Sequence, residues 1–293
     1  MSEQISIIIT TYKRDVHILK RAIDSVLKQT YNNIELIIIN DYYPYQKSID
    51  QLISSYAIPI IVFHNPTNKG ACYSRNRGIQ NAKGKYVAFL DDDDEWVPEK
   101  LQEEVKLMDS EVAMVYCSGY NIYPNGEKKE ITFIKAYSKD KQLNKLLYGN
   151  YMGGCSFPLI KTEVLRVLGG FDETLPSSQD FDLWIRITQQ YKVVYLPKPL
   201  VLYYIMPDSI TRSSKKRVRG YFSILKKHHY LYQKYPDCAV HIYNSIITVY
   251  VEHKEYLKTF VPFIKSFRYF PHNTYIIQFW FNIILKKITK NGK

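Results

Sequence analysis

The stretch YVAFLDDDDEW, residues 86–96, joins an apolar run to four consecutive aspartates and a glutamate. Ionised carboxylates this close together repel, and each raises the pKa of its neighbours unless positive charge lies among them. No basic residue stands between Asp91 and Glu95. Either water screens these acids, or the run is built to hold a cation.

The apolar part of this stretch is the fourth of a series of short segments rich in β-branched residues. We predict strands at 5–9, 34–40, 58–63 and 85–90, separated by helices at 16–29, 45–56 and 71–84. Gly84 is the predicted C-cap of the third helix. Strands that alternate with helices pair in parallel through right-handed crossovers, which predicts an α/β protein with a doubly wound, mostly parallel sheet.

In such a sheet, ligands bind beyond the carboxyl ends of the strands. This rule places four polar segments at one edge, namely residues 10–12, 40–41, 65–70 and 91–94. The acidic run therefore lies at the expected ligand crevice. We assign Asp94 and Glu95 to the dipole of the next helix, predicted at 97–108.

Beyond that helix the alternation loosens. The pattern predicts a strand at 111–118, a hairpin around Asn125-Gly126, a helix at 177–190 and one or two closing strands at 191–205.

The composition of the 293-residue chain, with 46% apolar residues, suits one large domain or a main domain with an appendage. The four cysteines are widely spaced without a Cys-x-x-Cys pair, which argues against a zinc site and fits reduced thiols. The N-terminus lacks signal-peptide features, and no apolar run is long enough to span a bilayer. We therefore expect a cytoplasmic protein.

The charge is unevenly distributed. Residues 212–293 hold 16 Lys and Arg against 3 Asp and Glu, a balance of +13, whereas residues 1–211 hold 24 against 25, a balance of −1. This asymmetry predicts a catalytic domain at 1–212 and a basic, aromatic, helical C-terminal region at 213–293. We divide the former into a nucleotide-binding half, 1–110, and an acceptor-side half, 111–212.

The C-terminal region contains an apolar stretch at 275–285, followed by lysines. It is too short to span a membrane but suits an interfacial helix on an anionic inner leaflet. The alternative is a helical subdomain that packs on the catalytic sheet or forms a homo-oligomer interface. Basic helices can also track nucleic acid, but the sequence shows no nucleic-acid motif and its acidic run would repel a phosphate backbone. We expect no nucleic-acid partner.

Four segments, in this order, resemble family 2 glycosyltransferases, an inverting group of nucleotide-sugar enzymes with the GT-A fold. They are SIIITTYKR (6–14), AIDSVLKQTYNNIELIIIND (22–41), NKGACYSRNRGIQNAKGKYVAFLDDDDEW (68–96) and GGFDETLPSSQDFDLWIRI (169–187). Each is weak alone, but their order and spacing together are specific, and the likeness covers about residues 5–212.

The resemblance implies a role for each matching residue. The implied donor-binding residues are Thr10, Tyr12, Asp41, Arg75, Asp91 and Asp92. Among them, Tyr12 would stack near the base and Asp41 would accept a hydrogen bond from a uracil N–H.

The resemblance also implies that Asp93 ligates a divalent metal, Mn²⁺ or Mg²⁺, and that Asp180 is the general base. Gly153 and Gly154 fall in the loop near the sugar and acceptor. The chain departs from the family pattern at Asn40, which replaces the first of two acids, and at Tyr42-Tyr43-Pro44, which replaces a small turn. Met206 stands where many members have His, so we expect no His ligand.

The chemistry agrees with these roles. A leaving diphosphate develops negative charge that a carboxylate-held hard cation offsets, and the acceptor hydroxyl must lose its proton to a base. One displacement with one base, Asp180, inverts the anomeric centre. Asp182 is the rival base, and Asp180 could instead serve as an N-cap. Tyr12 could serve only in packing, Arg75 in a surface ion pair, and Gly153-Gly154 as a plain turn.

The sequence thus predicts a metal-dependent inverting glycosyltransferase with a UDP-sugar donor. The predicted acceptor is a saccharide or lipid-linked saccharide hydroxyl in bacterial cell-surface polysaccharide or glycoconjugate synthesis; peptide and polyol-phosphate acceptors stay open. Two competing hypotheses are a non-catalytic nucleotide-binding relative and a nucleotidyltransferase. The latter usually has a glycine-rich loop after the first strand, and TTYKRD contains no glycine.

Overall fold

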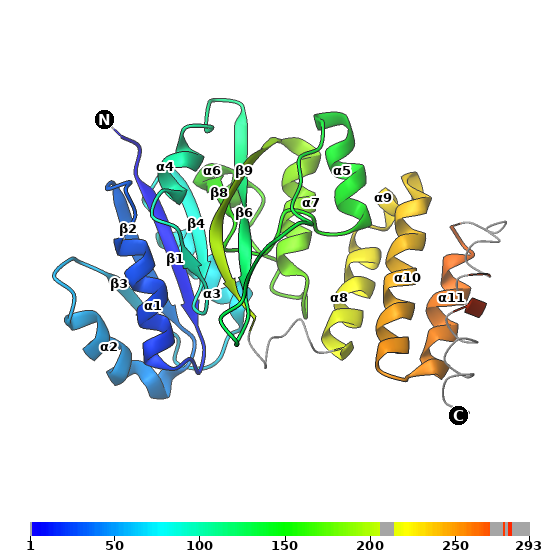
Figure 1. The fold of residues 1–293 in the computed structure, drawn as a ribbon, viewed down its shortest axis with the longest axis horizontal. Coiled ribbons are helices and arrows are strands. Elements are labelled where there is room, and N and C mark those ends of the chain that lie inside the picture. The colour runs from blue at the N-terminus through cyan, green and yellow to red at the C-terminus, as the bar shows by residue number, and fades with distance from the viewer. Residues whose placement is uncertain (1, 206–213, 270–277, 279–280, 283–293) are drawn as a thin grey trace. The chain divides into compact units, whose positions relative to one another are not determined.

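The computed structural model describes residues 2–205, 214–269, 278 and 281–282. Its strands form one nine-stranded sheet in the order β3-β2-β1-β4-β8-β6-β9-β5, with β7 beside β6 (Figure 1). The strands are β1 (Ile5–Thr11), β2 (Ile34–Asn40), β3 (Ile61–His64), β4 (Tyr86–Asp91), β5 (Glu95–Trp96), β6 (Val112–Ile122), β7 (Lys128–Glu130), β8 (Pro158–Lys161) and β9 (Lys192–Tyr204).

The predicted α/β fold is confirmed. Strands β1, β2, β3 and β4 pair in parallel, and the register across β1 and β4 sets Thr10 opposite Asp91. On the other side of β4 the sheet becomes mixed, because β8 runs antiparallel to both β4 and β6 while β9 runs parallel to β6. The carboxyl ends of the parallel strands therefore form one edge, where the acidic run begins.

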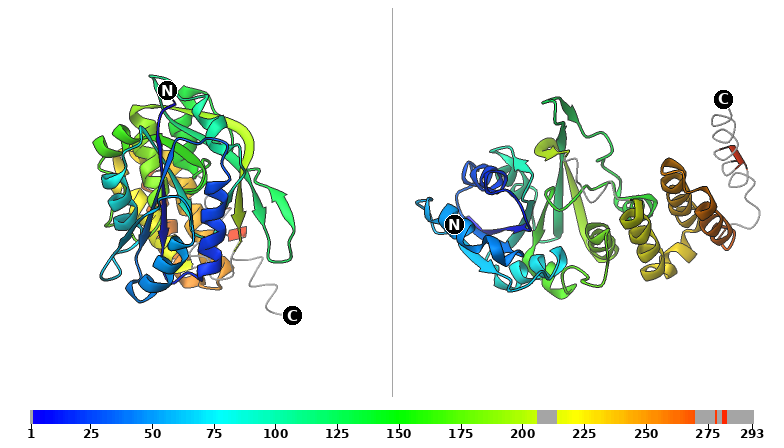
Figure 2. Two further views of the ribbon diagram at one scale, coloured as in Figure 1. Left: turned by 90° about the vertical axis from the view of Figure 1, so that its left-hand side faces the viewer. Right: turned by 90° about the horizontal axis from the view of Figure 1, so that it is seen from below.

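Helices cover both faces of the sheet. The helices that precede the C-terminal group are α1 (Val16–Leu27), η1 (Tyr43–Tyr45), α2 (Gln46–Ser54), α3 (Ala71–Asn81), α4 (Lys100–Val105), α5 (Lys139–Tyr148), α6 (Thr162–Val167) and α7 (Gln179–Gln190). Figure 2 shows α1 and α3 on opposite sides of the sheet. Helix α3 approaches β1 closely, since a β-carbon at Gly78 would lie 2.5 Å from Ile8 Cγ2.

The predicted C-cap at Gly84 is wrong. Helix α3 ends at Asn81, and Ala82 is already extended. Gly84 instead lies against the first strand, where a β-carbon would come within 2.6 Å of the Ser6 amide nitrogen. The glycine is required by this close approach of two backbones.

The second half of the sheet follows the predicted pattern. The hairpin from β6 to β7 turns through Gly126 at φ +82°, and the closing segment is one strand, β9. Its register with β6 shifts around Ser118 and Gly119. Helix α4 begins only at Lys100, after Pro98.

The chain divides into two compact units. The first contains residues 1–142, 151–173 and 180–207, and the second contains 143–150, 174–179 and the C-terminal helices. Those helices are α8 (Ser214–Lys227), α9 (His229–Lys234), α10 (Pro236–Glu252), η3 (Tyr256–Thr259) and α11 (Phe260–Ser266). The domain boundaries drawn from charge stay a prediction. Met206 and most of 275–285 lie outside the described residues.

Within the second unit, α10 packs against α8, α9 and α11. The loop 174–179 packs on α8, because Ser177 Oγ donates to the Lys216 carbonyl at 2.7 Å. A β-carbon at Gly220 would lie 2.4 Å from the hydroxyl oxygens of both Ser177 and Ser178. Gly220 therefore lets the loop that precedes Asp180 lie directly on the helix.

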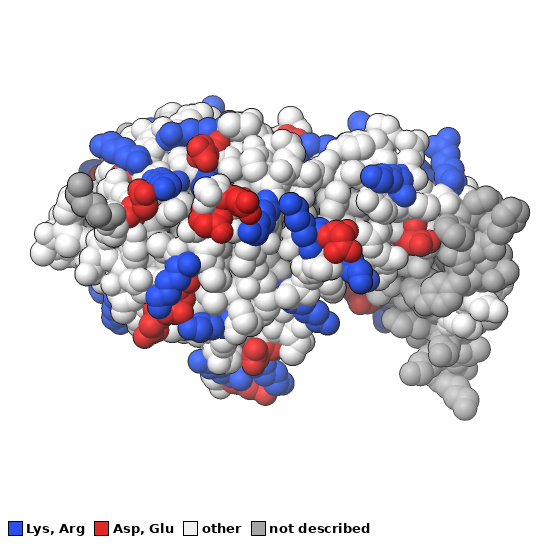
Figure 3. Space-filling model, turned by 90° about the horizontal axis from the view of Figure 1, so that it is seen from above, with Lys and Arg blue, Asp and Glu red and all other residues white. Residues whose placement is uncertain are grey.

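Charges are interspersed on the face drawn in Figure 3, where acidic groups separate many of the basic ones. In the part of the chain that the structure describes, no helix is both long and apolar enough to cross a bilayer.

Candidate active site

Two arginines hold the acidic run at the end of β4. Arg75 of α3 pairs with Asp91, with Nη2 2.7 Å from Oδ1. Arg14, in the loop after β1, spans two neighbours: its Nε lies 2.9 Å from Asp92 Oδ1 and its Nη2 lies 2.9 Å from Asp93 Oδ2. The positive charge that the run lacks in sequence is thus supplied from two distant segments.

The last two acids of the run lie in the loop after β4 and in strand β5. Asp94 is buried and accepts a 2.6 Å hydrogen bond from Ser156 Oγ. Glu95 lies in β5 and pairs with Arg21 Nε at 3.0 Å. The predicted helix-dipole role of both acids is wrong, because α4 starts only at Lys100.

Three of the aspartates have raised pKa values. Burial raises the pKa of Asp92 to about 6, although Arg14 opposes the shift. Burial, and then repulsion from Asp91, raise the pKa of Asp93 and Asp94. Burial and mutual repulsion therefore disfavour the ionised forms of these three carboxyl groups.

These carboxylates fit a hard divalent cation, which prefers oxygen ligands. Among the residues that the structure describes, no three His, Cys, Asp or Glu side chains gather as a metal-binding group. An ion held by Asp93 would need further oxygens from a bound molecule, as Mg²⁺ does when phosphates complete its coordination.

Asp180 lies in the first turn of α7 and is half-buried. Burial raises its pKa, the Phe181 amide and Arg75 lower it, and the charge of Asp91 raises it. The charges of the same three residues, Arg75, Asp91 and Asp180, also act on the buried thiol of Cys155. The predicted base and the predicted donor site therefore lie around one common region.

The rival base, Asp182, is fully buried. Its Oδ2 accepts from Arg186 Nη2 at 2.8 Å and from Nε at 2.9 Å. Arg186 in turn donates to the carbonyls of Leu168 and Gly170. This ion pair anchors the turn before the Asp180 segment, and its depth disfavours proton transfer to an acceptor.

The Gly153-Gly154 loop lies beside the acidic run, because Ser156 two residues later bonds Asp94. Gly153 has φ +85°, and a β-carbon there would lie 2.7 Å from the Phe157 ring. A β-carbon at Gly154 would meet nothing within 4 Å. The backbone at Gly154 thus has open space in front of it.

Asp41 is buried at the end of β2, and both of its oxygens support the loop 65–70. Oδ1 accepts from Asn65 Nδ2 at 2.7 Å and from the Lys69 amide at 2.8 Å, and Oδ2 accepts from the Gly70 amide at 2.8 Å. A nucleobase N–H at Asp41 would share these oxygens. Asp41 therefore holds the loop 65–70 against the end of β2.

Aromatic rings gather at the same edge. Tyr12 is 43% exposed and meets Tyr42 edge-on at 5.5 Å between ring centroids, and Tyr42 meets Tyr45 at 4.9 Å. Lys13, with φ +52°, places its Nζ 5.0 Å from the Tyr42 centroid. The turn after β2 therefore places the rings of Tyr42 and Tyr45 beside Tyr12.

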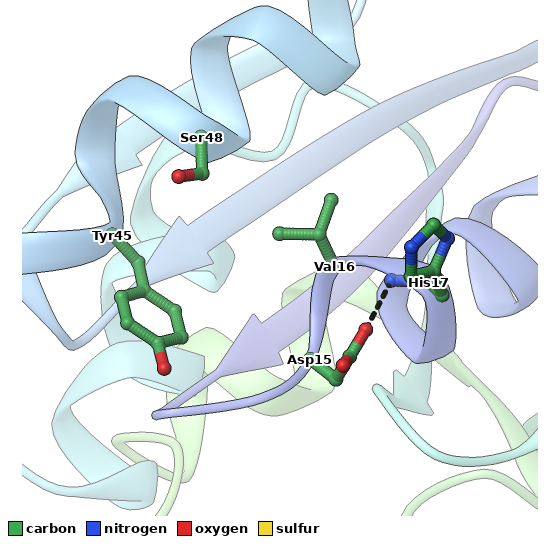
Figure 4. A pocket seen from close by; sticks show the side chains of 5 residues that line it. All are labelled: Asp15, Val16, His17, Tyr45 and Ser48. Atoms are coloured by element: carbon green, nitrogen blue, oxygen red, sulfur yellow. Dashed lines mark hydrogen bonds between the residues drawn. The ribbon is translucent and has the colours of Figure 1, made fainter.

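An open pocket adjoins these tyrosines (Figure 4). The Asp15 carboxylate caps α1 by accepting from the His17 amide at 2.7 Å. The lining residues are Asp15, Val16, His17, Tyr45 and Ser48.

Sequence reasoning missed Arg14, Arg21 and Ser156. A signal existed for Arg14, since TTYKRD sets a basic pair directly after β1, beside the strand that ends in the acidic run. No local pattern marks Ser156, whose role depends on how its loop folds.

Comparisons with known proteins bear on the family and the fold of this chain. The family model Glycosyl transferase family 2 matches residues 6–169. The glycosyltransferase MJ1057 of Methanocaldococcus jannaschii is 30% identical over 232 residues, 76% of this chain and 79% of MJ1057. WcaA of Escherichia coli K12, named as a colanic acid biosynthesis glycosyl transferase, is 29% identical over 228 residues, 76% of this chain and 81% of WcaA.

The structure of Staphylococcus aureus TarS 1–349 in complex with UDP-GlcNAc shares the fold. The TM-score is 0.61 at 15% identity, covering 96% of this chain and 79% of TarS 1–349. The nucleotidyltransferase and binding-module hypotheses are set aside, since the family model and the relatives identify a transferase of glycosyl groups. The chain belongs to glycosyl transferase family 2.

Proposed function

We propose that this enzyme transfers a sugar from a UDP-sugar to an acceptor hydroxyl with inversion, with Asp180 as the general base. The observation that carries the proposal is the shared environment of Asp180 and the Arg75–Asp91 pair. A carboxylate that acts as the general base should lie close to the donor, and a raised pKa makes it a better proton acceptor. The raised pKa of Asp180 and its closeness to Asp91 support this role, whereas Asp182 is buried and paired with Arg186.

The donor edge supports a nucleoside diphosphate. Tyr12 and the tyrosines after β2 offer ring surfaces to a base, and Arg75 offers positive charge. TarS, which shares the fold, has been solved with UDP and with UDP-GlcNAc, which favours uridine here. Thr10, Asp41, Asp91 and Asp92 are the further donor residues that we propose.

Asp93 is the proposed ligand of Mn²⁺ or Mg²⁺. The ion would help to neutralise the leaving diphosphate, because Arg14 and Arg75 already pair with aspartates of the run. Gly153 and Gly154 line the proposed sugar and acceptor side.

The proposed acceptor is a saccharide, or a lipid-linked saccharide, of a bacterial cell-surface polymer. The relationship to WcaA supports this choice. We place the enzyme in the cytoplasm or on the inner face of the cell membrane, with residues 1–212 catalytic and 213–293 as a basic region.

Calorimetric titration of UDP, GDP, CDP and TDP, with and without Mn²⁺, tests the proposal. We expect selective, Mn²⁺-assisted UDP binding that Asp93→Ala weakens. Asp140→Ala removes an exposed carboxylate from α5 and is the matched control. Preference for another nucleotide would overturn the UDP assignment, and unaltered binding by Asp93→Ala would overturn the metal role.

A further inference from the structure

The segment formed by η3 and α11 encloses small side chains and exposes large apolar ones, which is the reverse of a helix that packs in a protein core. It buries Thr259, Pro262 and Ser266, with Thr259 and Ser266 fully enclosed. Both buried hydroxyls donate to carbonyls three residues earlier, at 2.6 Å. The two fully enclosed side chains are therefore small and polar, and their hydroxyls bond to carbonyls within the segment.

The outer face of the same segment is apolar. Leu257 is 94% exposed, and Phe260, Val261 and Ile264 are at least half exposed. Their positions follow the i, i+3, i+4, i+7 spacing of one helix face. We call these four residues the α11 apolar face. They are four of the twelve large hydrophobic side chains that are exposed among the described residues.

Such a cluster differs from the single exposed hydrophobic residues of ordinary surfaces. Scattered apolar side chains on a surface need no explanation, whereas a contiguous patch marks an interaction site. Packing among the described residues of the second unit leaves these four large apolar side chains exposed.

The rim of the α11 apolar face is cationic. Lys254, Lys258, Lys265 and Arg268 are exposed along this segment. Glu255 pairs with Lys258 at 2.9 Å. Over residues 214–269 the sequence holds 11 Lys and Arg against 3 Asp and Glu. An apolar face inside a basic rim matches a bilayer with anionic headgroups, which receives both kinds of group at its interface.

We infer that the α11 apolar face docks on an anionic lipid bilayer, with the four side chains inserted among the acyl chains and the basic rim against the headgroups. This inference deepens the proposed function, because it names the surface that would bring the enzyme to a lipid-linked acceptor.

The test measures co-sedimentation of the full chain with vesicles of phosphatidylcholine, with and without phosphatidylglycerol. We expect binding that needs phosphatidylglycerol and that Leu257→Ser/Ile264→Ser weakens by about tenfold or more, since two inserted apolar side chains are lost. Lys258→Gln/Lys265→Gln should also weaken binding to the vesicles that contain phosphatidylglycerol, because it removes two charges of the basic rim. Val167→Ser, which alters a 73% exposed apolar residue of α6, is the matched control and should bind as wild type.

Other occupants give different results. Undiminished vesicle binding by the double serine variant, together with a smaller mass in light scattering, would overturn the inference in favour of a second copy. Undiminished vesicle binding together with a lower melting temperature would overturn it in favour of packing by the chain itself. UDP titration of the same variants separates the two proposals, because loss of nucleotide binding bears on the catalytic assignment and loss of vesicle binding bears on this face.

Discussion

Arg14 shows how a single side chain can stabilise an acidic site before its ligand arrives. It bridges Asp92 and Asp93 while remaining partly accessible, with 27% of its side chain exposed. The guanidinium thus occupies an oxygen of the proposed metal ligand. A cation at Asp93 would compete with Arg14 for this carboxylate, and a diphosphate would give a released guanidinium a new bidentate partner.

Arg14→Gln should therefore change metal and nucleotide binding in opposite directions. We expect Mn²⁺ alone to bind about tenfold more tightly, because a charge-assisted contact no longer competes for Asp93. UDP in the presence of Mn²⁺ should bind more weakly. Titration at pH 8 with spectroscopic detection of unbound Mn²⁺ measures both, and Arg14→Lys, which keeps the charge, should behave closer to wild type. Weaker binding of Mn²⁺ alone would contradict the competition.

The proposed base, Asp180, leads to a prediction for the pH dependence of turnover. The base must be ionised to accept a proton, and burial raises its pKa above the ordinary value. The value of kcat/KM should therefore rise with pH through a pKa above the 3.9 or so of an unperturbed aspartate. Asp180→Asn should lower turnover at least a hundredfold and leave UDP affinity nearly intact. Turnover like that of the wild type would place the base elsewhere.

At the scale of elements, α4 carries a fully buried ion pair. Lys100 Nζ lies 2.6 Å from Glu104 Oε2, neither side chain is exposed, and the ammonium also lies 4.4 Å from the Trp96 ring centroid. Burial raises the pKa of Glu104 to about 7, although Lys100 opposes the shift. Because the folded pKa exceeds the ordinary 4.5, the contribution of this carboxyl to stability falls as pH rises from about 4.5 to about 7.

Lys100→Met should destabilise the protein by about 3 kcal/mol or more, since it leaves a buried carboxylate without its cation. The loss should be larger at pH 8 than at pH 5, where the carboxyl can take up a proton. Lys100→Met/Glu104→Leu should recover most of the loss. Urea unfolding at the two pH values measures these differences. A double variant as unstable as the single one would indicate that the pair itself is favourable.

At the scale of the whole molecule, UDP and Mn²⁺ should stabilise the fold through the first unit. At a ligand concentration about a hundredfold above Kd, linkage adds about 2.7 kcal/mol to the free energy of unfolding. Scanning calorimetry should show a higher melting temperature for wild type, and a smaller rise for Asp93→Ala. An equal rise in both proteins would show that Asp93 contributes nothing to ligand binding.

Local patterns made much of this fold predictable. Short apolar runs rich in β-branched residues indicated the strands, and helical spacing of apolar residues indicated the helices. The parallel pairing placed the acidic run at the ligand edge. The arrangement within the edge was not predictable, because its contacts are distant in sequence. Arg14 and Asp92 are 78 positions apart, and Ser156 and Asp94 are 62 apart. Asp94 and Glu95 were misassigned because nearness in sequence to a helix suggested a dipole, whereas a loop and a strand hold them.

The contact of loop 174–179 with Gly220 has a consequence for engineering chimaeras. The loop lies within the motif that carries Asp180, yet it belongs to the same compact unit as α8. Grafting the C-terminal helices of a relative at the 212/213 boundary would replace α8, on which this loop packs. The two serines of the loop would stay unchanged. A graft that places any side chain at position 220 would push those serines away, so the exchangeable module consists of the helices together with the loop.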